Sequence, residues 1–407
     1  MASISAEINP SISGKSVNRI DSIDILRAIT MILMIFVNDF WSLKNIPDWL
    51  RHTARGVDGI GFSDVIFPAF LFIVGLSLPY AIQNRRSKGA GNFEIVKHVL
   101  FRTIALILMG VFLVNGESIN IEATGIIAGT WYPMVCLCFI LIWNNYSRSL
   151  NKILSIILKY SAIVILIVLA FVYRGAEAGD LRFESHWWGI LGLIGWAYLL
   201  SAMITIYANN NGYILLFGWL FFCVLSMINK ADLLPSWEVL NYIPGTIKGG
   251  TLAGLTMGGV LTSHVFRYYV KKDAHIKLTL VLMSASIILI VLSVLTRPYW
   301  GLAKLGATPA WLFLSSALTL IAFTIIYWIA DVWQKANLFK LIKPAGTETL
   351  LCYLIPYFIY AVYKWTGLEF PEILSNGCLG LLKSFSFAIL CVFITNRLIV
   401  LGIRLKI

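Results

Sequence analysis

The residue of this sequence best suited to chemistry is His52, which stands in a polar stretch, 41–61, between two long apolar segments. Histidine takes up and releases protons near neutral pH, so it can act as a general base or as a nucleophile. Asn38 ends the apolar segment before it, and Asp64 begins the one after it, where a carboxylate could accept a hydrogen bond from the imidazole and fix its tautomer. The alternative is a solvated loop histidine without a chemical role. The two flanking polar residues favour the catalytic interpretation modestly.

Basic residues gather beside the third apolar segment. Arg102 lies about one turn inside that segment, and Arg85, Arg86 and Lys88 stand in the loop before it. Together they could attract a polyphosphate such as a nucleotide or coenzyme A, and Arg102 could hold a phosphate through two hydrogen bonds. The alternative is that Arg102 only extends toward the lipid headgroups.

The first apolar segment carries polar residues at both ends. Arg27 follows Asp24 by three positions, so the two share a helix face and can form an ion pair. Such a pair either anchors the segment at the membrane edge or faces a ligand. At the far end, Asp39 should face the helix bundle or a wet cavity, because an unsatisfied polar group is costly there.

Two further stretches interrupt the apolar pattern. The run Lys304-Leu-Gly-Ala-Thr-Pro-Ala-Trp311 precedes an apolar segment on the same side as His52. Lys304, Thr308 and Trp311 could line a cavity there, and with Asp39 they form our candidate substrate-binding set. The glycine-dense stretch 249–259 predicts close helix packing, or alternatively the wall of a narrow tunnel.

The composition predicts a membrane protein. Of the 407 residues, 59% are hydrophobic and 13% charged, which is more apolar surface than a soluble domain can bury. A helix needs about 20 apolar residues to cross a bilayer, whereas a β-barrel would show short alternating segments. We therefore predict an all-α, polytopic helical protein with about twelve transmembrane helices, and not fewer than about ten. The expected spans are 22–40, 62–83, 97–115, 124–144, 153–173, 188–208, 213–229, 248–266, 276–296, 309–332, 348–363 and 380–403.

The distribution of charge predicts the orientation. Lysine and arginine are about twice as numerous in the loops on one side, which places both termini in the cytoplasm and His52 outside it. We expect a cytoplasmic tail over 1–21 and one transmembrane domain over 22–407. The start of the chain lacks the apolar core of a cleavable signal peptide, so the first span should act as an uncleaved signal.

Several functions are disfavoured. The net charge of +12 fits loops that face anionic lipid, so we expect no nucleic-acid partner. The six cysteines fall almost entirely in apolar segments and lack the spacing of a zinc site or a disulfide framework. The chain has no H-E-x-x-H, Gly-x-Ser-x-Gly or Walker motif, so we expect no catalytic metal, serine hydrolase or NTP-driven pump.

The first two segments carry a resemblance. The run Ser22–Asn38, then His52, then Ser63–Gly75 resembles the heparan-α-glucosaminide N-acetyltransferase family, and more closely its bacterial relatives of the DUF5009 group. The similarity continues more loosely through Arg102, the Lys304–Trp311 run and the stretch 345–349. Departures are found in the loop after His52 and in two additional spans near 188–229.

The resemblance implies a transmembrane acyltransferase domain over 22–407. It assigns His52 to the family's active-site histidine, Asn38 to its neighbouring asparagine and Asp64 to the aspartate that precedes Phe-Pro. Arg102 matches a basic residue near the coenzyme, and Arg27 and Arg86 complete our candidate coenzyme-binding set.

We therefore predict a multi-pass protein of the cell (inner) membrane that moves an acetyl group from cytosolic acetyl-CoA to an amino sugar or glycan on the extracytoplasmic side. His52 would serve as general base or as a transient acetyl carrier. The expected partners are coenzyme A, the acceptor and the lipid bilayer, and a homodimer stays open. The alternatives are a transporter of a sugar or lipid-linked glycan, and a glycan O-acetyltransferase.

Overall fold

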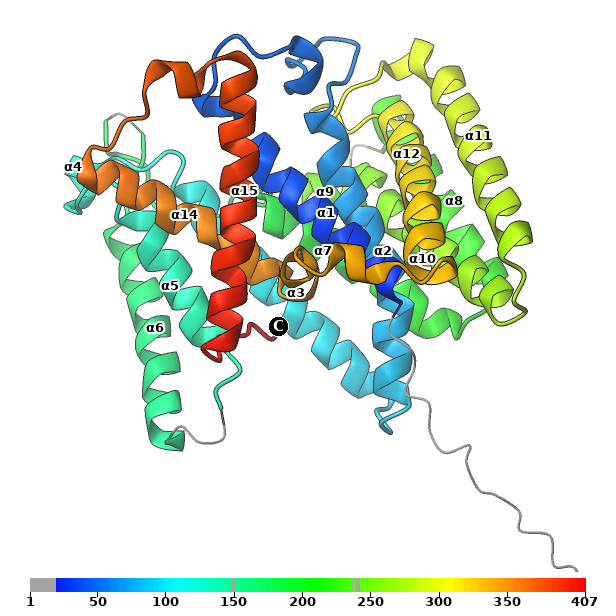
Figure 1. Ribbon diagram of the computed structural model, residues 1–407, viewed down its shortest axis with the longest axis horizontal. Helices are drawn as coiled ribbons and strands as arrows, with labels where there is room; N and C mark the ends of the chain where they lie inside the picture. The colour runs from blue at the N-terminus through cyan, green and yellow to red at the C-terminus, as the bar shows by residue number, and fades with distance from the viewer. Residues whose placement is uncertain (1–19, 148–150, 177, 236, 239–241) are drawn as a thin grey trace, which may run out of the picture.

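The computed structural model of the protein describes residues 20–147, 151–176, 178–235, 237–238 and 242–407 (Figure 1). The expected cytoplasmic tail, 1–21, lies almost entirely outside these residues. Within the described ranges the regular structure is helical, and the β contacts are isolated bridges rather than strands. The prediction of an all-helical fold is confirmed for this part of the chain.

Each expected span corresponds to one helix of 13 residues or more, with ends that differ by a few residues. In the described ranges these helices are α1 (Asp21–Asn38), α2 (Ser63–Arg86), α3 (Asn92–Asn115), α5 (Trp131–Trp143), α6 (Lys152–Val172), α7 (Ile190–Ala208), α8 (Gly212–Lys230), α10 (Thr251–Val270), α11 (His275–Trp300), α12 (Pro309–Tyr327), α14 (Thr349–Thr366) and α15 (Gly377–Val400). Short helices connect them: α4 (Ile121–Thr124), α9 (Gly245–Gly249) and α13 (Lys343–Thr347).

Eight of the described helices are long and apolar enough to cross a membrane. They are α2, α3, α6, α7, α8, α11, α12 with the π-turn that extends it to Val332, and α15. Of the remaining long helices, α5 has only 13 residues, and α1 carries three charged residues, Asp21, Asp24 and Arg27, within its 18 residues. A multi-pass membrane protein is thus supported, while the count of twelve spans and the orientation remain predictions.

Local sequence explains where several helices begin and end. Thr308 caps α12 by accepting a hydrogen bond from the backbone N–H of Trp311, and proline occupies the first turn. Gly250 separates α9 from α10 with a φ of +66°, a conformation that glycine adopts at little cost. The expected span 124–144 is shortened to α5, because a turn over 125–130 contains two glycines at positive φ.

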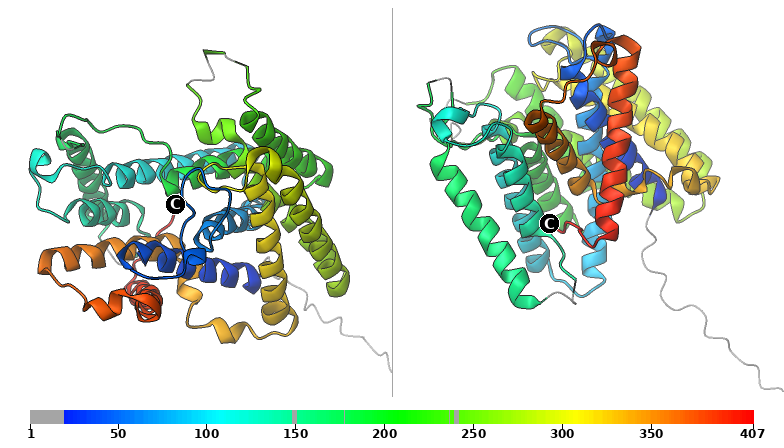
Figure 2. Two further views of the ribbon diagram at one scale, coloured as in Figure 1. Left: turned by 90° about the horizontal axis from the view of Figure 1, so that it is seen from above. Right: turned by 60° about the vertical axis from the view of Figure 1, so that its left-hand side comes forward.

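The described helices differ in how much of their surface they bury. Helices α2, α3, α7 and α12 are central, whereas α6, α8 and α11 are mostly exposed and lie at the margins (Figures 1 and 2). The exposed residues of these marginal helices include large apolar side chains such as Phe171, Phe217 and Ile287. Such surfaces suit contact with lipid rather than water.

The middle parts of α2 and α10 touch backbone to backbone. A Cβ atom on Gly75 would lie 1.8 Å from the carbonyl oxygen of Thr256, and one on Gly259 would lie 1.9 Å from that of Phe72. Only glycine permits such an approach, so the glycine-dense stretch 249–259 serves close helix packing in its middle and at its end.

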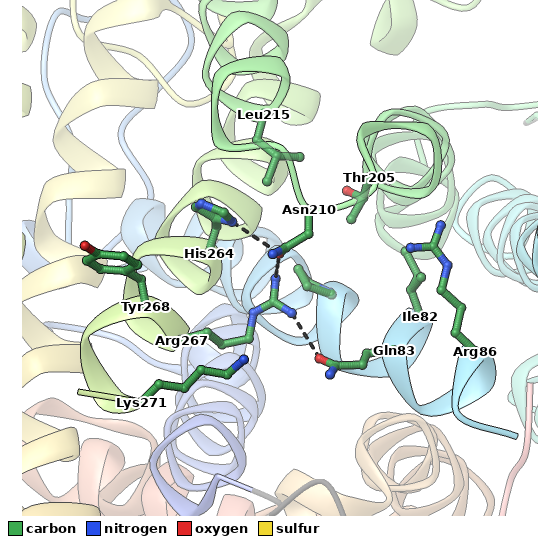
Figure 3. A pocket seen from close by; sticks show the side chains of 11 residues that line it. Ile82, Gln83, Arg86, Thr205, Asn210, Leu215, His264, Arg267, Tyr268 and Lys271 are labelled. Carbon is green, nitrogen blue, oxygen red and sulfur yellow. Dashed lines mark hydrogen bonds between the residues drawn. The ribbon is translucent and has the colours of Figure 1, made fainter. Parts of the chain in front are cut away.

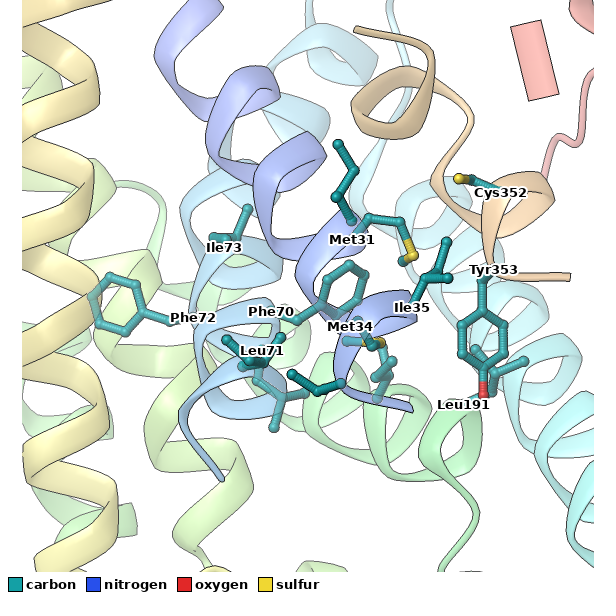
Figure 4. Close-up of a cluster of buried hydrophobic side chains, with 14 of the residues drawn as sticks. Met31, Met34, Ile35, Phe70, Leu71, Phe72, Ile73, Leu191, Cys352 and Tyr353 are labelled. Carbon is teal, nitrogen blue, oxygen red and sulfur yellow. The ribbon is translucent and has the colours of Figure 1, made fainter. Parts of the chain in front are cut away.

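The central core fixes the helix ends that carry the polar residues. Met31, Met34 and Ile35 of α1 meet Phe70 of α2 and Tyr353 of α14 among the buried side chains (Figure 4). Asn38 ends α1, and Ser63 and Asp64 begin α2, so this packing holds these positions near one another.

The two ends of the helix assembly differ. We call the end with loops 41–61, 301–308 and 367–376 the histidine end, since hydrogen bonds join the first of these loops to the other two. The opposite end, with turns 87–91, 209–211 and 271–274, we call the basic end. In Figure 1 the histidine end is at the top and the α2–α3 turn is at the bottom.

Candidate functional site

His52 and Asp64 form a close pair at the histidine end. The imidazole Nδ1 lies 2.7 Å from Asp64 Oδ1. A carboxylate can only accept, so Nδ1 carries the proton in this pair and Nε2 remains as the basic nitrogen. The Asp64 side chain is 1% exposed, whereas that of His52 is 45% exposed. The buried carboxylate thus orients an accessible imidazole.

Asp64 is itself held by the backbone. Its Oδ2 accepts hydrogen bonds from the N–H groups of Thr53, at 2.9 Å, and Gly61, at 3.0 Å. A Cβ on Gly61 would lie 1.8 Å from the Arg51 carbonyl oxygen, so the loop requires glycine there. The Ser63 hydroxyl donates to the Leu50 carbonyl and ties the start of α2 to the same loop.

Lys304 reaches the pair from a distant part of the chain. Its Nζ lies 3.2 Å from His52 Nδ1 and 3.9 Å from Asp64 Oδ1. Because Nδ1 already donates to Asp64, the ammonium acts on the pair mainly as a positive charge. Burial lowers the pKa of Lys304, and the Asp64 charge opposes that shift.

The loop that carries Lys304 is fixed to the loop of His52. Asp58 Oδ1 accepts from the Leu302 backbone N–H at 2.7 Å, and the Arg297 guanidinium donates to the same carboxylate at 3.1 Å. Gly59 donates its N–H to the Leu302 carbonyl at 2.9 Å. The backbone hydrogen bond and Arg297 hold the pKa of Asp58 below its usual value. These contacts explain how Lys304 arrives beside His52.

Trp311 and Thr308 support the same region differently. The Trp311 indole N–H donates to the Asp64 backbone carbonyl at 3.0 Å, and its side chain is 1% exposed. Thr308 is buried in its role as the cap of α12. Trp311 therefore contacts the site directly, and Thr308 positions the helix that presents it.

A cavity of about 390 Å³ lies in front of the histidine. We call it the histidine cavity, and its polar wall includes Asn38, His52, Ser63 and Lys304, with Trp311 beside them. The other walls come from α7 and the segment before it, α9 and α10, and include Trp188, Thr246, Gly249 and Thr251. Nothing in the spacing of Trp188 and Thr246 connects them to His52 in the sequence, whereas Gly249 and Thr251 belong to the stretch 249–259, for which the wall of a tunnel was the alternative prediction.

Asp39 lies outside the histidine cavity. Its carboxylate is 4% exposed, 3.3 Å from Lys383 Nζ, and accepts hydrogen bonds from the hydroxyls of Tyr360, at 2.9 Å, and Ser384. These partners belong to α14 and α15. The structure thus places Asp39 in a buried network that joins three helices.

At the basic end, Arg86 lines a second cavity of about 350 Å³ (Figure 3). We call it the basic cavity; His264, Arg267 and Lys271 of α10 also line it. Two neutral oxygens hold the Arg267 guanidinium, those of Asn210 at 2.7 Å and Gln83 at 3.1 Å. None of the described lining residues is acidic, so the cavity suits an anion.

The other two arginines of the coenzyme-binding set lie elsewhere. Arg27 pairs with Asp24 at 3.0 Å and donates to the Gly346 carbonyl at 3.0 Å and to the Ser77 hydroxyl. It therefore joins α1 to α2 and α13. The Arg102 guanidinium lies over the Tyr198 ring, 4.9 Å from its centre, on the α3–α7 contact. Neither residue lines the basic cavity.

Comparison with known proteins adds the family. A family model described as "Domain of unknown function (DUF5009)" matches residues 19–247, which is more than half of the chain. The chain belongs to the DUF5009 family. The match includes His52, Asn38 and Asp64 but ends before Lys304.

Two curated relatives of this DUF5009 protein are heparan-alpha-glucosaminide N-acetyltransferases. The Mus musculus protein is 28% identical over 116 residues, which cover 28% of this chain and 16% of that protein. The Homo sapiens protein is 31% identical over 101 residues, which cover 24% of this chain and 14% of that protein. The chain thus matches only a small part of each relative's length, and this distant likeness supports a transferase kind of activity.

Proposed function

We propose that this DUF5009 protein is a transmembrane acetyltransferase, which moves an acetyl group from coenzyme A to an amino sugar or related glycan. The observation that carries the proposal is the accessible His52 imidazole, oriented by the buried Asp64 carboxylate and facing a cavity shared with Asn38 and Lys304. The likeness to proteins named N-acetyltransferases supports the reaction class.

In the direct route, the acceptor nitrogen attacks the thioester carbonyl while His52 Nε2 takes the proton that this nitrogen loses. The carbon–sulfur bond then breaks, and the proton passes from the imidazolium to the departing thiolate. Asp64 stabilises the imidazolium, and the Lys304 ammonium and Asn38 amide would stabilise the negative charge that develops on the carbonyl oxygen.

In the stepwise route, Nε2 attacks the thioester itself. The carbon–sulfur bond breaks, the coenzyme leaves as a thiolate, and the acetyl group stays on the imidazole until the acceptor nitrogen displaces it. The proton that this nitrogen loses passes to the freed Nε2 and from there to the thiolate. Both routes use the same residues, and trapping of acetylated His52 in the absence of acceptor would distinguish them.

The basic cavity fits the phosphate groups of the donor. Arg86, Arg267 and Lys271 would bind them at the end opposite His52. Asp64 and Arg86 are 22 positions apart on α2, which corresponds to about 33 Å along a helix. Since the middle parts of α2 and α10 are in contact, the transfer requires a second conformation in which the acetyl-bearing arm can reach His52.

The test uses purified protein in sealed liposomes, with radiolabelled acetyl-CoA on one side and glucosamine on the other. His52→Ala should lower acetyl transfer by about 10²- to 10⁴-fold, the usual contribution of an acid–base group, while coenzyme A still binds. His275→Gln is the matched control, because His275 bonds Tyr327 and Asp273 and does not line the histidine cavity. Equal product from intact protein and His52→Ala would refute the catalytic role of His52.

A second candidate function is transport of a sugar or lipid-linked glycan. Two cavities at opposite ends of α2 and α10, with the glycine contact between them, are also expected of a carrier with alternating access. Coenzyme A binding separates the two proposals, because a simple carrier has no need of it.

A further inference from the structure

A third and larger cavity, of about 1090 Å³, lies between the ends of α1 and α3, helix α5 and one face of α14. We call it the aromatic cavity, because Tyr353, Tyr357, Tyr360 and Tyr363 line it from α14 at intervals of three or four residues. A chamber of about 240 Å³ lies beside it and shares Tyr353 and Tyr357 with it. The mechanism proposed above uses Asn38 alone of the residues that line these two spaces.

Aromatic rings and one carboxylate meet where the two spaces join. The Tyr132 ring of α5 stacks on Tyr357 with ring centres 5.1 Å apart, and Tyr353 meets Tyr357 edge to face at 6.0 Å. Glu117 lines both spaces, and its charge acts electrostatically on Tyr132 and Tyr353. We call these four residues the cage. Aromatic rings beside a carboxylate suit an ammonium group, which is attracted to the ring faces and forms an ion pair with the carboxylate.

The Glu117 carboxylate is available for such a cation. Among the described residues it has no hydrogen-bond or ion-pair partner, although His186 acts on it electrostatically. Burial raises the pKa of Glu117, and the His186 charge opposes that shift. A cation bound in the cage would stabilise the charged carboxylate and lower this pKa again.

Lys364 is the single lysine or arginine among the described residues that line the aromatic cavity. It lies two turns beyond Tyr357 on α14, about 10.5 Å along the helix. Side chains on a helix lean toward its N-terminus, so the Lys364 ammonium should point back toward the cage. The stem of Lys364 passes close to Gly129, where a Cβ atom would lie 3.2 Å from Lys364 Cβ. No carboxylate of the described chain pairs with Lys364, so its charge can take a phosphate.

The remaining lining of the aromatic cavity suits a lipid. Branched apolar side chains form much of it: Ile35, Leu113, Ile119, Ile121, Ile126 and Ile127. Trp41 also lines the cavity and is 75% exposed. Tryptophan and tyrosine are enriched where a bilayer meets water, which is the depth of the lipid headgroups. An apolar wall thus lies beside two charged groups at a depth where headgroups are expected.

We propose that the aromatic cavity binds a zwitterionic phospholipid, with the ammonium of its headgroup in the cage, its phosphate at Lys364 and its acyl chains along the apolar wall. One anion and one cation without partners match a headgroup that carries both charges. A sugar would leave the Lys364 charge and the apolar wall without partners. The inference goes beyond the proposed function and does not depend on it, since a phospholipid bound here is neither the acetyl donor nor the acceptor.

The experiment measures lipid retention in the absence of any acetyl donor. The full chain is reconstituted in nanodiscs with equal amounts of phosphatidylethanolamine, phosphatidylcholine and phosphatidylglycerol, all with the same acyl chains. Native mass spectrometry then identifies the lipids that stay bound when the nanodisc is removed. The two lipids with an ammonium group should be retained in preference to phosphatidylglycerol, which has the phosphate alone. Equal retention of all three lipids would overturn the proposal.

Variants of the two charged residues separate their interactions. Glu117→Gln should abolish the preference for the ammonium lipids, whereas Lys364→Met should lower the retention of all three lipids, because each carries the phosphate. Glu122→Gln is the matched control, because Glu122 is exposed on α4 and does not line the cavity. A preference for ammonium lipids that persists in Glu117→Gln would contradict the proposed headgroup site.

Variants of Tyr357 test the role of the rings. Tyr357→Ala should weaken phosphatidylethanolamine retention about tenfold, within the range of a desolvated contact between a cation and a ring. Tyr357→Phe keeps the ring and should retain most of the binding, which separates the loss of the ring from misfolding. Tyr299→Ala is the matched control, because Tyr299 is exposed at the end of α11 and does not line the cavity. Equal losses in Tyr357→Phe and Tyr357→Ala, or displacement of the lipid by glucosamine, would overturn the inference.

Discussion

Asp64 contacts the site through three of its atoms. One carboxylate oxygen holds His52, the other accepts two backbone N–H groups, and the backbone carbonyl accepts the Trp311 indole. The loop of His52, helix α2 and helix α12 therefore meet at Asp64, and the position of the His52 imidazole depends on this residue.

Replacement of Asp64 by asparagine tests this arrangement. The asparagine amide has about the same shape as the carboxylate but no charge, so it cannot stabilise the imidazolium. Its NH₂ group would also face N–H groups that already donate to Asp64. We expect Asp64→Asn to lower kcat by about 10²- to 10⁴-fold in the sealed-liposome assay. Coenzyme A affinity should stay the same, and an unchanged kcat would contradict the orienting role.

Lys304 provides a prediction for pH. Its pKa is lowered in the folded protein, so between that lowered value and the ordinary lysine value of about 10.4 the unfolded chain binds more protons than the folded one. The free energy of unfolding should therefore rise with pH across that window. Thermal unfolding in detergent should show this rise, and Lys304→Met should remove it. If the midpoint of thermal unfolding responded to pH equally in the unmodified protein and in Lys304→Met, the lowered pKa of Lys304 would be contradicted.

At the scale of elements, the α2–α10 contact is the tightest constraint described above. Gly259→Ala should destabilise the protein by about 1–3 kcal/mol, because the new methyl group meets the Phe72 backbone and the helices must separate. The midpoint of thermal unfolding in detergent measures the effect. Gly91→Ala is the matched control, since a Cβ there meets nothing within 4 Å. Equal midpoints for the two variants would show that the helices separate freely.

Helix α10 also supplies the basic cavity. Two neutral oxygens hold Arg267 in place while its charge stays available, so Arg267→Gln should weaken coenzyme A binding about tenfold or more. Calorimetry with coenzyme A and with pantetheine, which lacks the phosphates, measures this. Only the coenzyme A affinity should fall, and an unchanged affinity would place the phosphates elsewhere.

Sequence patterns predicted the helices better than the tertiary contacts between them. Apolar runs placed α2 and α10 to within a few residues, but they extended α5 across a glycine turn that apolar composition does not reveal. His52 lies in the loop that leads directly into α2, and Asp64 follows it by 12 positions at the start of that helix, so their pairing was within reach of the sequence. Lys304 is 252 positions from His52, and one sequence does not say which loops meet. Arg267 was missed for the same reason, because its partners Gln83 and Asn210 lie in distant parts of the chain.

At the scale of the whole molecule, Cys378 can report the sidedness. It is exposed at the start of α15, next to the bridge between Lys44 and Asn376 that joins this segment to the loop of His52. The other five cysteines are buried. An impermeant maleimide should therefore label the protein from the extracytoplasmic side of sealed vesicles.

Two variants complete this experiment. Cys378→Ser should abolish the labelling, and Lys88→Cys added to that background should restore it only after the cytoplasmic face is opened. Labelling of Cys378 only after permeabilisation would invert the orientation and place His52 in the cytoplasm.

The backbone contact between Gly75 and Gly259 also bears on the energetics of the cell that makes this protein. It lies midway along two helices whose ends line cavities, and buried apolar side chains such as Met257 and Val260 pack around it. Under the proposed function, a chemical group would be delivered across the bilayer past this packing while the ion gradients on either side are preserved. Abundant synthesis of such a protein would then be compatible with a fully charged membrane.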